Sequence, residues 1–132
     1  MGQNQILMLI LSVIIVGVAV AVGINQFGEN ALIANRDAIA SDCQRIISTA
    51  QQWFRKPVSL GGGGNTFTGL TLSELAIDPT NENGSFTLTV DSATQITVVG
   101  TGIENSPATS APLTVTLVHD AATNTITYAD DL

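Results

Sequence analysis

The sequence of 132 residues is poor in cysteine, basic residues and aromatic side chains. Its one cysteine, Cys43, cannot form an internal disulfide, so the fold must be held by packing and backbone hydrogen bonds. Only four residues are basic, and no Lys or Arg follows Pro57. Because nucleic-acid binding depends on basic side chains that neutralise phosphates, the chain is predicted not to bind DNA or RNA.

The residue clusters that catalysis requires are also missing from the sequence. His119 is the only histidine, and no nucleophile or partner can be assigned to it, so we predict that it is a surface side chain. The four glycines at 61–64 have neither the Lys nor the following helix of a phosphate-binding loop, and a flexible linker or a tight wrap is expected there. The acidic residues lack the spacing of a calcium loop. We therefore predict a protein that is not an enzyme and has no cofactor or metal.

What the sequence does contain is a long apolar run, residues 6–24, which reads ILMLILSVIIVGVAVAVGI. It is long enough to cross a membrane as a helix. It is apolar on every face, so it must be buried in lipid or among other apolar helices. The five residues before it carry no Lys or Arg, unlike the start of a secretory signal peptide. We expect that a basic leader preceded Met1 and has been removed.

From residue 31 the pattern becomes that of an amphipathic helix, which we expect to end near Pro57. Apolar residues recur at steps of four and three, which places them on one helical face. Cys43 is interpreted as a small core hydrophobe within this face. The face is a predicted head-domain core stripe that comprises Ile39, Cys43, Ile46, Ala50 and Trp53.

The last third of the chain alternates apolar and threonine residues, which is typical of a half-buried antiparallel sheet. Four strands are predicted, at residues 86–90, 96–99, 113–117 and 126–128. Gly100 and Gly102 are expected to form a bulge or a bend at a strand end. Residues 65–77 fit either an edge strand or a helical turn, and 78–84 read as a loop.

The apolar face of these strands needs a cover, and the core stripe is the available candidate. The predicted fold class is therefore α+β: a long N-terminal helix with its C-terminal half packed on a small antiparallel sheet of about four strands. Three parts are expected along the chain: a hydrophobic helix at 1–28, an amphipathic helix at 29–57 and a head domain at 58–132. The head domain is rich in threonine and carries eight acidic residues with no basic one after Pro57.

An apolar N-terminal helix without a basic flank, continuing as an amphipathic helix under a small antiparallel sheet, resembles the type IV pilin family. The resemblance covers the whole architecture, while the sequence match is confined to about the first 30 residues. It implies a precursor cut by a prepilin peptidase, with Met1 as the mature first residue, which the family usually N-methylates, and a pilus assembly machinery as partner. Pilins usually carry glutamate at mature position five, where this chain has Gln5. We expect a neutral polar cluster of Gln3, Asn4 and Gln5 to take over that assembly role, because a charged pair in an apolar core has a large desolvation cost.

The resemblance implies a structural subunit of an extracellular, cell-surface helical filament built from identical copies. Before assembly the subunit would sit in the inner or cytoplasmic membrane. Two alternatives stay open: a minor pseudopilin of a secretion system, and a single-span membrane-anchored binding domain. Small residues at alternating positions would allow close helix approach. The residues expected in the filament core are Ile6, Leu9, Val13, Val16, Gly17, Val20 and Gly23.

Two loops hold candidate glycosylation sites. Asn83 begins the sequence Asn-Gly-Ser, which is an N-x-S sequon, although an ordinary turn is the alternative reading. Ser106, Thr109 and Ser110 lie in a loop rich in Pro, Ala, Ser and Thr, which is a candidate for O-glycans.

Overall fold

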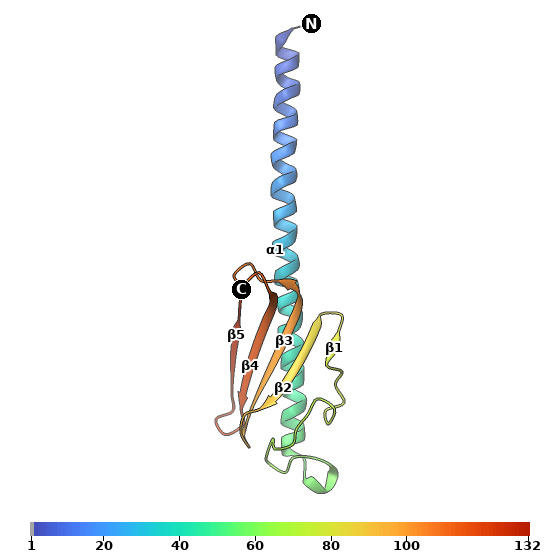
Figure 1. Ribbon diagram of the computed structural model, residues 1–132, viewed down its shortest axis with the longest axis vertical. Coiled ribbons are helices and arrows are strands. Elements are labelled where there is room, and N and C mark those ends of the chain that lie inside the picture. The colour runs from blue at the N-terminus through green and yellow to red at the C-terminus, as the bar shows by residue number, and fades with distance from the viewer. Residues whose placement is uncertain (1) are drawn as a thin grey trace. The chain divides into compact units, whose positions relative to one another are not determined.

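The computed structural model describes residues 2–132, which form one long helix and a five-stranded antiparallel sheet (Figure 1). The predicted α+β class, with a helix packed on an antiparallel sheet, is confirmed. Met1, the expected mature N-terminus, lies outside the described residues. By its internal contacts the chain divides into two compact units, Met1–Ile33 and Ala34–Leu132.

The first unit consists of the N-terminal part of helix α1, which runs from Gln3 to Arg55. Gly17, Gly23 and Gly28 lower helix propensity, yet they lie within continuous helix. The hydroxyl of Ser12, the one polar side chain in the apolar run, donates a hydrogen bond to the carbonyl of Met8 at 2.8 Å. The helix therefore satisfies this hydroxyl internally and presents no unpaired donor to an apolar environment.

The second unit contains the rest of α1 and a sheet in which every strand pairs with the next one along the chain. Four of the strands correspond to the predicted segments, and each extends beyond the predicted bounds. The additional strand has two residues and lies within the stretch that we predicted to be a loop. A short 3-10 helix, η1, spans Val58–Leu60. The strands are β1 (Thr80–Asn81), β2 (Gly84–Val90), β3 (Gln95–Asn105), β4 (Pro112–Asp120) and β5 (Thr125–Asp130).

The core of the second unit lies between α1 and the sheet. Four of the five predicted stripe residues are completely buried, and Trp53 is partly buried at the end of the stripe. Strands β3 and β4 supply the opposing side chains. Burying side chains of this size contributes about 1.5–3 kcal/mol each. The fully buried members from the two strands are Ile96, Val98, Leu113, Val115 and Leu117.

Gly100 and Gly102 lie within β3 on the face toward the helix, and both are buried. A Cβ atom at Gly100 would overlap Ile39, and one at Gly102 would overlap the side-chain oxygen of Asn35. The pairing of β3 with β4 shifts register between Thr101 and Asn105, so an irregularity is present at Gly102, whereas Gly100 is paired regularly and neither glycine lies at the end of the strand as predicted. The physical reason for the glycines is the close approach of the helix to the sheet.

The glycines at 61–64 form a tight wrap around the end of α1. The amide of Gly63 donates to the carbonyl of Trp53 at 2.8 Å, and that of Gly64 donates to Lys56 at 2.9 Å. A Cβ at Gly63 would overlap the Trp53 ring and the carbonyl of Thr66. Of the two expectations for this stretch, the wrap is correct and the flexible linker is wrong, because these amides satisfy the last carbonyls of the helix.

Residues 65–77 form neither an edge strand nor a helix but a series of turns. The amide of Phe67 donates to the carbonyl of Ala93 at 2.7 Å, which ties this segment to the turn between β2 and β3. Phe67, Leu70 and Leu75 are buried. The segment therefore closes one end of the core, where the ring of Phe67 packs against Phe54 of the helix and His119 of β4.

Candidate assembly surface

The apolar run of the first unit is exposed on all sides. Every large apolar side chain from Ile6 to Phe27 is between 50% and 76% exposed. The stretch has the length and composition to cross a membrane, and none of it is buried within the chain. By these criteria alone it suits a membrane anchor or a signal sequence.

The exposed run has a large energetic consequence. Full burial of one Val, Leu or Ile side chain contributes about 1.5–3 kcal/mol, so the run as a whole amounts to tens of kcal/mol. The described chain offers this surface no cover. A stable state of the molecule therefore requires lipid, detergent or apolar protein surface around residues 6–24.

The predicted filament-core residues do not differ in exposure from their neighbours on the other faces of the helix. The structure thus does not distinguish these predicted filament-core residues from the rest of the apolar run. The glycines are more informative, because within the described residues a Cβ added at Gly17, Gly23 or Gly28 would meet no atom within 4 Å outside the local helix. Packing inside the chain does not require glycine at these three positions.

Gln3, Asn4 and Gln5 form the first turn of α1, and all three are exposed. This turn contains no acidic residue, so no charge offsets the positive end of the helix dipole. The amide of Gln5 donates to the carbonyl of Gly2 at 3.1 Å. The cluster places neutral side-chain donors and acceptors at the helix start, beside backbone amides that have no acceptor within the helix.

In the second unit, Asn35 is a buried polar residue that our sequence analysis missed. Its Nδ2 donates to the carbonyl of Asn83 at 2.9 Å. Its Oδ1 accepts from the amides of Ile103 at 3.1 Å and Glu104 at 3.4 Å. One side chain thereby ties α1 to the β1–β2 turn and to the irregular part of β3. Its position four residues before Ile39, which continues the core stripe, was the available signal.

The prediction that His119 is a surface residue is wrong, because only 1% of it is exposed. Nδ1 lies 3.2 Å from the carbonyl of Thr125, and Nε2 lies 3.2 Å from Nε2 of Gln51. A carbonyl can only accept, so Nδ1 carries the proton and Nε2 accepts from the Gln51 amide. Burial lowers the pKa of His119 below its ordinary value of 6.5. The ring, edge-on to Phe67, is a neutral core group.

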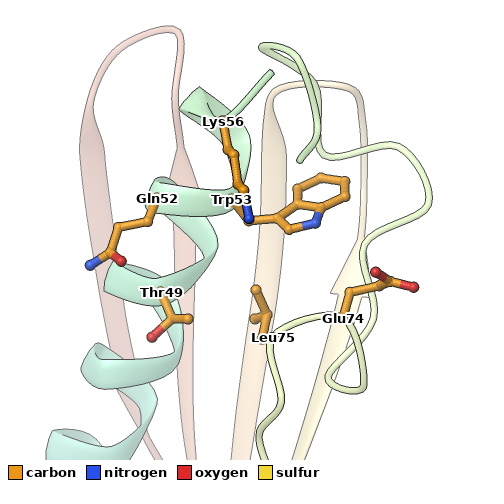
Figure 2. Close-up of a pocket in the computed structure, with 6 residues that line it drawn as sticks. All are labelled: Thr49, Gln52, Trp53, Lys56, Glu74 and Leu75. Carbon is orange, nitrogen blue, oxygen red and sulfur yellow. The ribbon is translucent and has the colours of Figure 1, made fainter. Parts of the chain in front are cut away.

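A shallow hollow of about 180 Å³ lies beside the C-terminal end of α1 (Figure 2). The indole Nε1 of Trp53 is buried there and has no hydrogen-bond partner within residues 2–132. Figure 2 shows the side chains of Gln52 and Glu74 pointing to opposite sides of the hollow, so they do not converge on a common ligand position. The hydroxyl of Thr49 donates to the carbonyl of Arg45 at 3.0 Å, within its own helix. Its lining residues are Thr49, Gln52, Trp53, Lys56, Glu74 and Leu75.

Cys43 is completely buried in the core stripe. Burial raises the pKa of its thiol to about 12, so it stays protonated and chemically inert. In the described part of the chain, no group of three or more His, Cys, Asp or Glu residues is placed to hold a metal ion.

The candidate glycosylation residues differ in accessibility. Nδ2 of Asn83, the atom that would carry a glycan, donates to Asp42 at 2.9 Å and the residue is partly buried, which favours the ordinary turn. Ser106 is buried and its hydroxyl donates to the carbonyl of Asp131, so the expectation of an O-glycan at Ser106 is wrong. Thr109 and Ser110 are exposed.

Comparison of the chain with protein-family models, curated proteins and solved structures finds no match. The geometry itself provides a long helix whose apolar surface is unburied within its own chain, and a head with its own core. These two features are compatible with a pilin-like or membrane-anchored subunit.

Proposed function

We propose that the chain is the structural subunit of an extracellular helical filament and polymerises through residues 6–24 of α1. The observation that carries this proposal is the exposure of that whole run, with no part of it buried in the chain. Identical copies can bury the exposed apolar surface of this run against one another. The membrane serves as the reservoir of subunits before assembly.

Transfer from lipid to a bundle of neighbouring helices changes the hydrophobic exposure of the run very little. Assembly must therefore gain its free energy from close packing and polar pairing, which small residues favour. The absence of intrachain neighbours at Gly17, Gly23 and Gly28, among the described residues, supports such external packing. Ser12 needs no partner in the bundle, since its hydroxyl is already bonded within the helix.

The polar cluster at the helix start supplies the pairing in this proposal. The side-chain oxygen of Gln5 can accept a hydrogen bond from an ammonium group of a neighbour without carrying charge itself. A neutral acceptor avoids the desolvation cost of burying a carboxylate. Cleavage of a leader by a prepilin peptidase and methylation of Met1 belong to the same proposal, and mass spectrometry of the N-terminal peptide from purified filaments would check both.

Shearing of cells that express the chain separates the filament from the single-span anchor, which the same exposed helix would also suit. A filament subunit is expected in the supernatant as fibres visible by electron microscopy and containing this chain. A monomeric anchor remains in the membrane pellet and is released only by detergent. Long, abundant fibres favour a pilus, whereas short and scarce ones favour a pseudopilin. Absence of the chain from sheared material would refute the filament proposal.

A further inference from the structure

The sheet of the second unit extends beyond the helix that covers it. Strand β5 pairs with β4 so that Tyr128 lies opposite Leu117 and Ile126 lies opposite His119. Directly opposed residues of an antiparallel pair share one face of the sheet. Leu117 and His119 are almost completely buried, whereas Ile126 is 49% exposed and Tyr128 is 46% exposed. The helix-facing side of β5 is therefore left uncovered.

The opposite side of the helix is covered by the chain itself. Leu70 and Leu75 of the segment before β1 are buried in the core cluster, whereas Phe67 of the same segment lies at the end of the helix, with its ring 6.0 Å from that of His119 in β4. On β2 the helix-facing residues Leu88 and Val90 are partly buried and pack against the core cluster. All six residues of β5, by contrast, are exposed. The apolar residues of β2 thus pack against the core cluster, whereas those of β5 remain about half exposed.

Three of the features that usually protect an edge strand, which are lysine, proline and a bulge, are also missing from β5. It is the last strand in the sheet order, and its pairing with β4 runs in continuous register without a bulge. Its sequence, TITYAD, contains no lysine and no proline. Natural sheets commonly use these devices to prevent association at an edge. Their absence from β5 is expected where association is part of the function.

We propose that the apolar helix of a second copy, residues 6–28, covers the helix-facing side of β5 at Ile126 and Tyr128. This inference rests on the proposed filament function and names one of its contacts. The uncovered surface continues the interface that α1 already makes with β3 and β4, so the same type of helix-on-sheet packing extends across β5.

The chemistry of the two surfaces is complementary. Residues 6–28 carry no charged side chain. On the uncovered face of β5 the single charged residue is Asp130, whose carboxylate already accepts from the hydroxyl of Tyr128 at 2.6 Å. Near this end the Arg36 guanidinium is paired with Asp37 at 2.9 Å. Each charged group at this end of β5 therefore already has a hydrogen-bond partner, and the apolar surface that a second copy would cover consists of Ile126 and the ring of Tyr128.

Substitutions on the two faces of one strand test the contact in the full-length chain. Ile126→Asp and Ile126→Gln place a charge or an amide on the helix-facing side, and both are expected to lower the mass of sheared filaments. Thr127→Asp changes the neighbouring exposed residue on the opposite face of β5 and is the matched control, with unchanged filament mass expected. The emission of Trp53, the single tryptophan, in detergent micelles checks that each variant keeps its head folded.

Disulfide cross-linking between copies tests the same contact independently of any effect on folding. A tagged chain with Ile126→Cys is co-assembled with untagged chains that carry single cysteines placed in turn at residues 6–28. Cys43 does not interfere, because its thiol is buried. Mixed dimers are expected with one or more helix positions, since disulfides need Cα atoms within about 7 Å. Thr127→Cys is expected to yield none.

The outcomes separate this contact from the function on which it rests. If wild-type chains form no filaments, the proposed function fails. If wild-type filaments form while Ile126→Gln assembles as well as Thr127→Asp, the contact is refuted and the filament stands. The contact is also refuted if no helix position cross-links to residue 126, or if residue 127 cross-links equally well.

Discussion

Replacing Asn35 with alanine removes the polar link between α1 and two parts of the sheet. The change deletes the hydrogen bonds to Asn83, Ile103 and Glu104. It leaves one carbonyl and two amides without their partner, and each buried group left unsatisfied costs about 1–3 kcal/mol. Ile103 and the turn at Asn83 lie near solvent and can partly rehydrate. We therefore expect a loss of about 2–4 kcal/mol in the free energy of unfolding.

The assay for the Asn35 variant is urea unfolding of the full chain in mild detergent, followed by the fluorescence of Trp53. The slope of the unfolding free energy against urea concentration is expected to stay the same while the midpoint falls. That result would indicate a loss of stability rather than a change in the unfolded state. Gln44→Ala, an exposed change on the same helix, is the control and is expected to alter stability by less than about 0.5 kcal/mol. If Asn35→Ala matched this control, the reasoning that these bonds hold the helix to the sheet would be wrong.

Three other predictions concern the core, the buried histidine and the helix start. Gly100→Val would force a side chain into Ile39 and is expected to cost about 1–3 kcal/mol in the same unfolding assay, whereas an equal stability would show that helix and sheet can separate without cost. Because the folded pKa of His119 is lowered, the unfolded chain binds more protons, so stability is full above pH 6.5 and falls as the pH drops below it, until the lowered pKa is reached. Unfolding midpoints measured from about pH 7.5 to 5.5 should show this loss in the wild type and not in His119→Gln; equal slopes would contradict it. Gln5→Leu is expected to lower filament yield after shearing relative to Val13→Leu, and equal yields would remove the polar cluster from assembly.

The largest features of this fold follow from local patterns in the sequence. The composition of the run at 6–24 is sufficient by itself to show that the helix is apolar on every face. The alternation of the strands and the spacing of Ile39, Cys43 and Ile46 have periods of two and of about 3.6 residues, which assign each side chain to a face. These periods were sufficient to predict a helix on an antiparallel sheet. The same alternation, Leu113 to Leu117, continues to His119 and was sufficient to predict its burial, which our reading overlooked.

Other features were decided by contacts between distant residues. β1 exists because Thr80 and Asn81 turn back onto β2, and a two-residue strand has no periodicity to detect. The wrap at 61–64 forms because the amides of the glycines bond to the carbonyls of Trp53 and Lys56 at the end of the helix. Asn35 accepts a hydrogen bond from the amide of Ile103, which lies 68 positions later in the chain. The local sequence around either residue does not predict this pairing.

By itself the sequence determined that the chain has an apolar helix needing external burial, together with an amphipathic helix and strands able to form a head. Only the tertiary structure decided which surfaces remain open once the head has formed. The width of the sheet relative to its covering helix leaves Ile126 and Tyr128 exposed, although both lie on the apolar side of β5. Periodicity assigns a residue to a face, but its burial depends on whether another element lies above it, and that is a property of the whole fold.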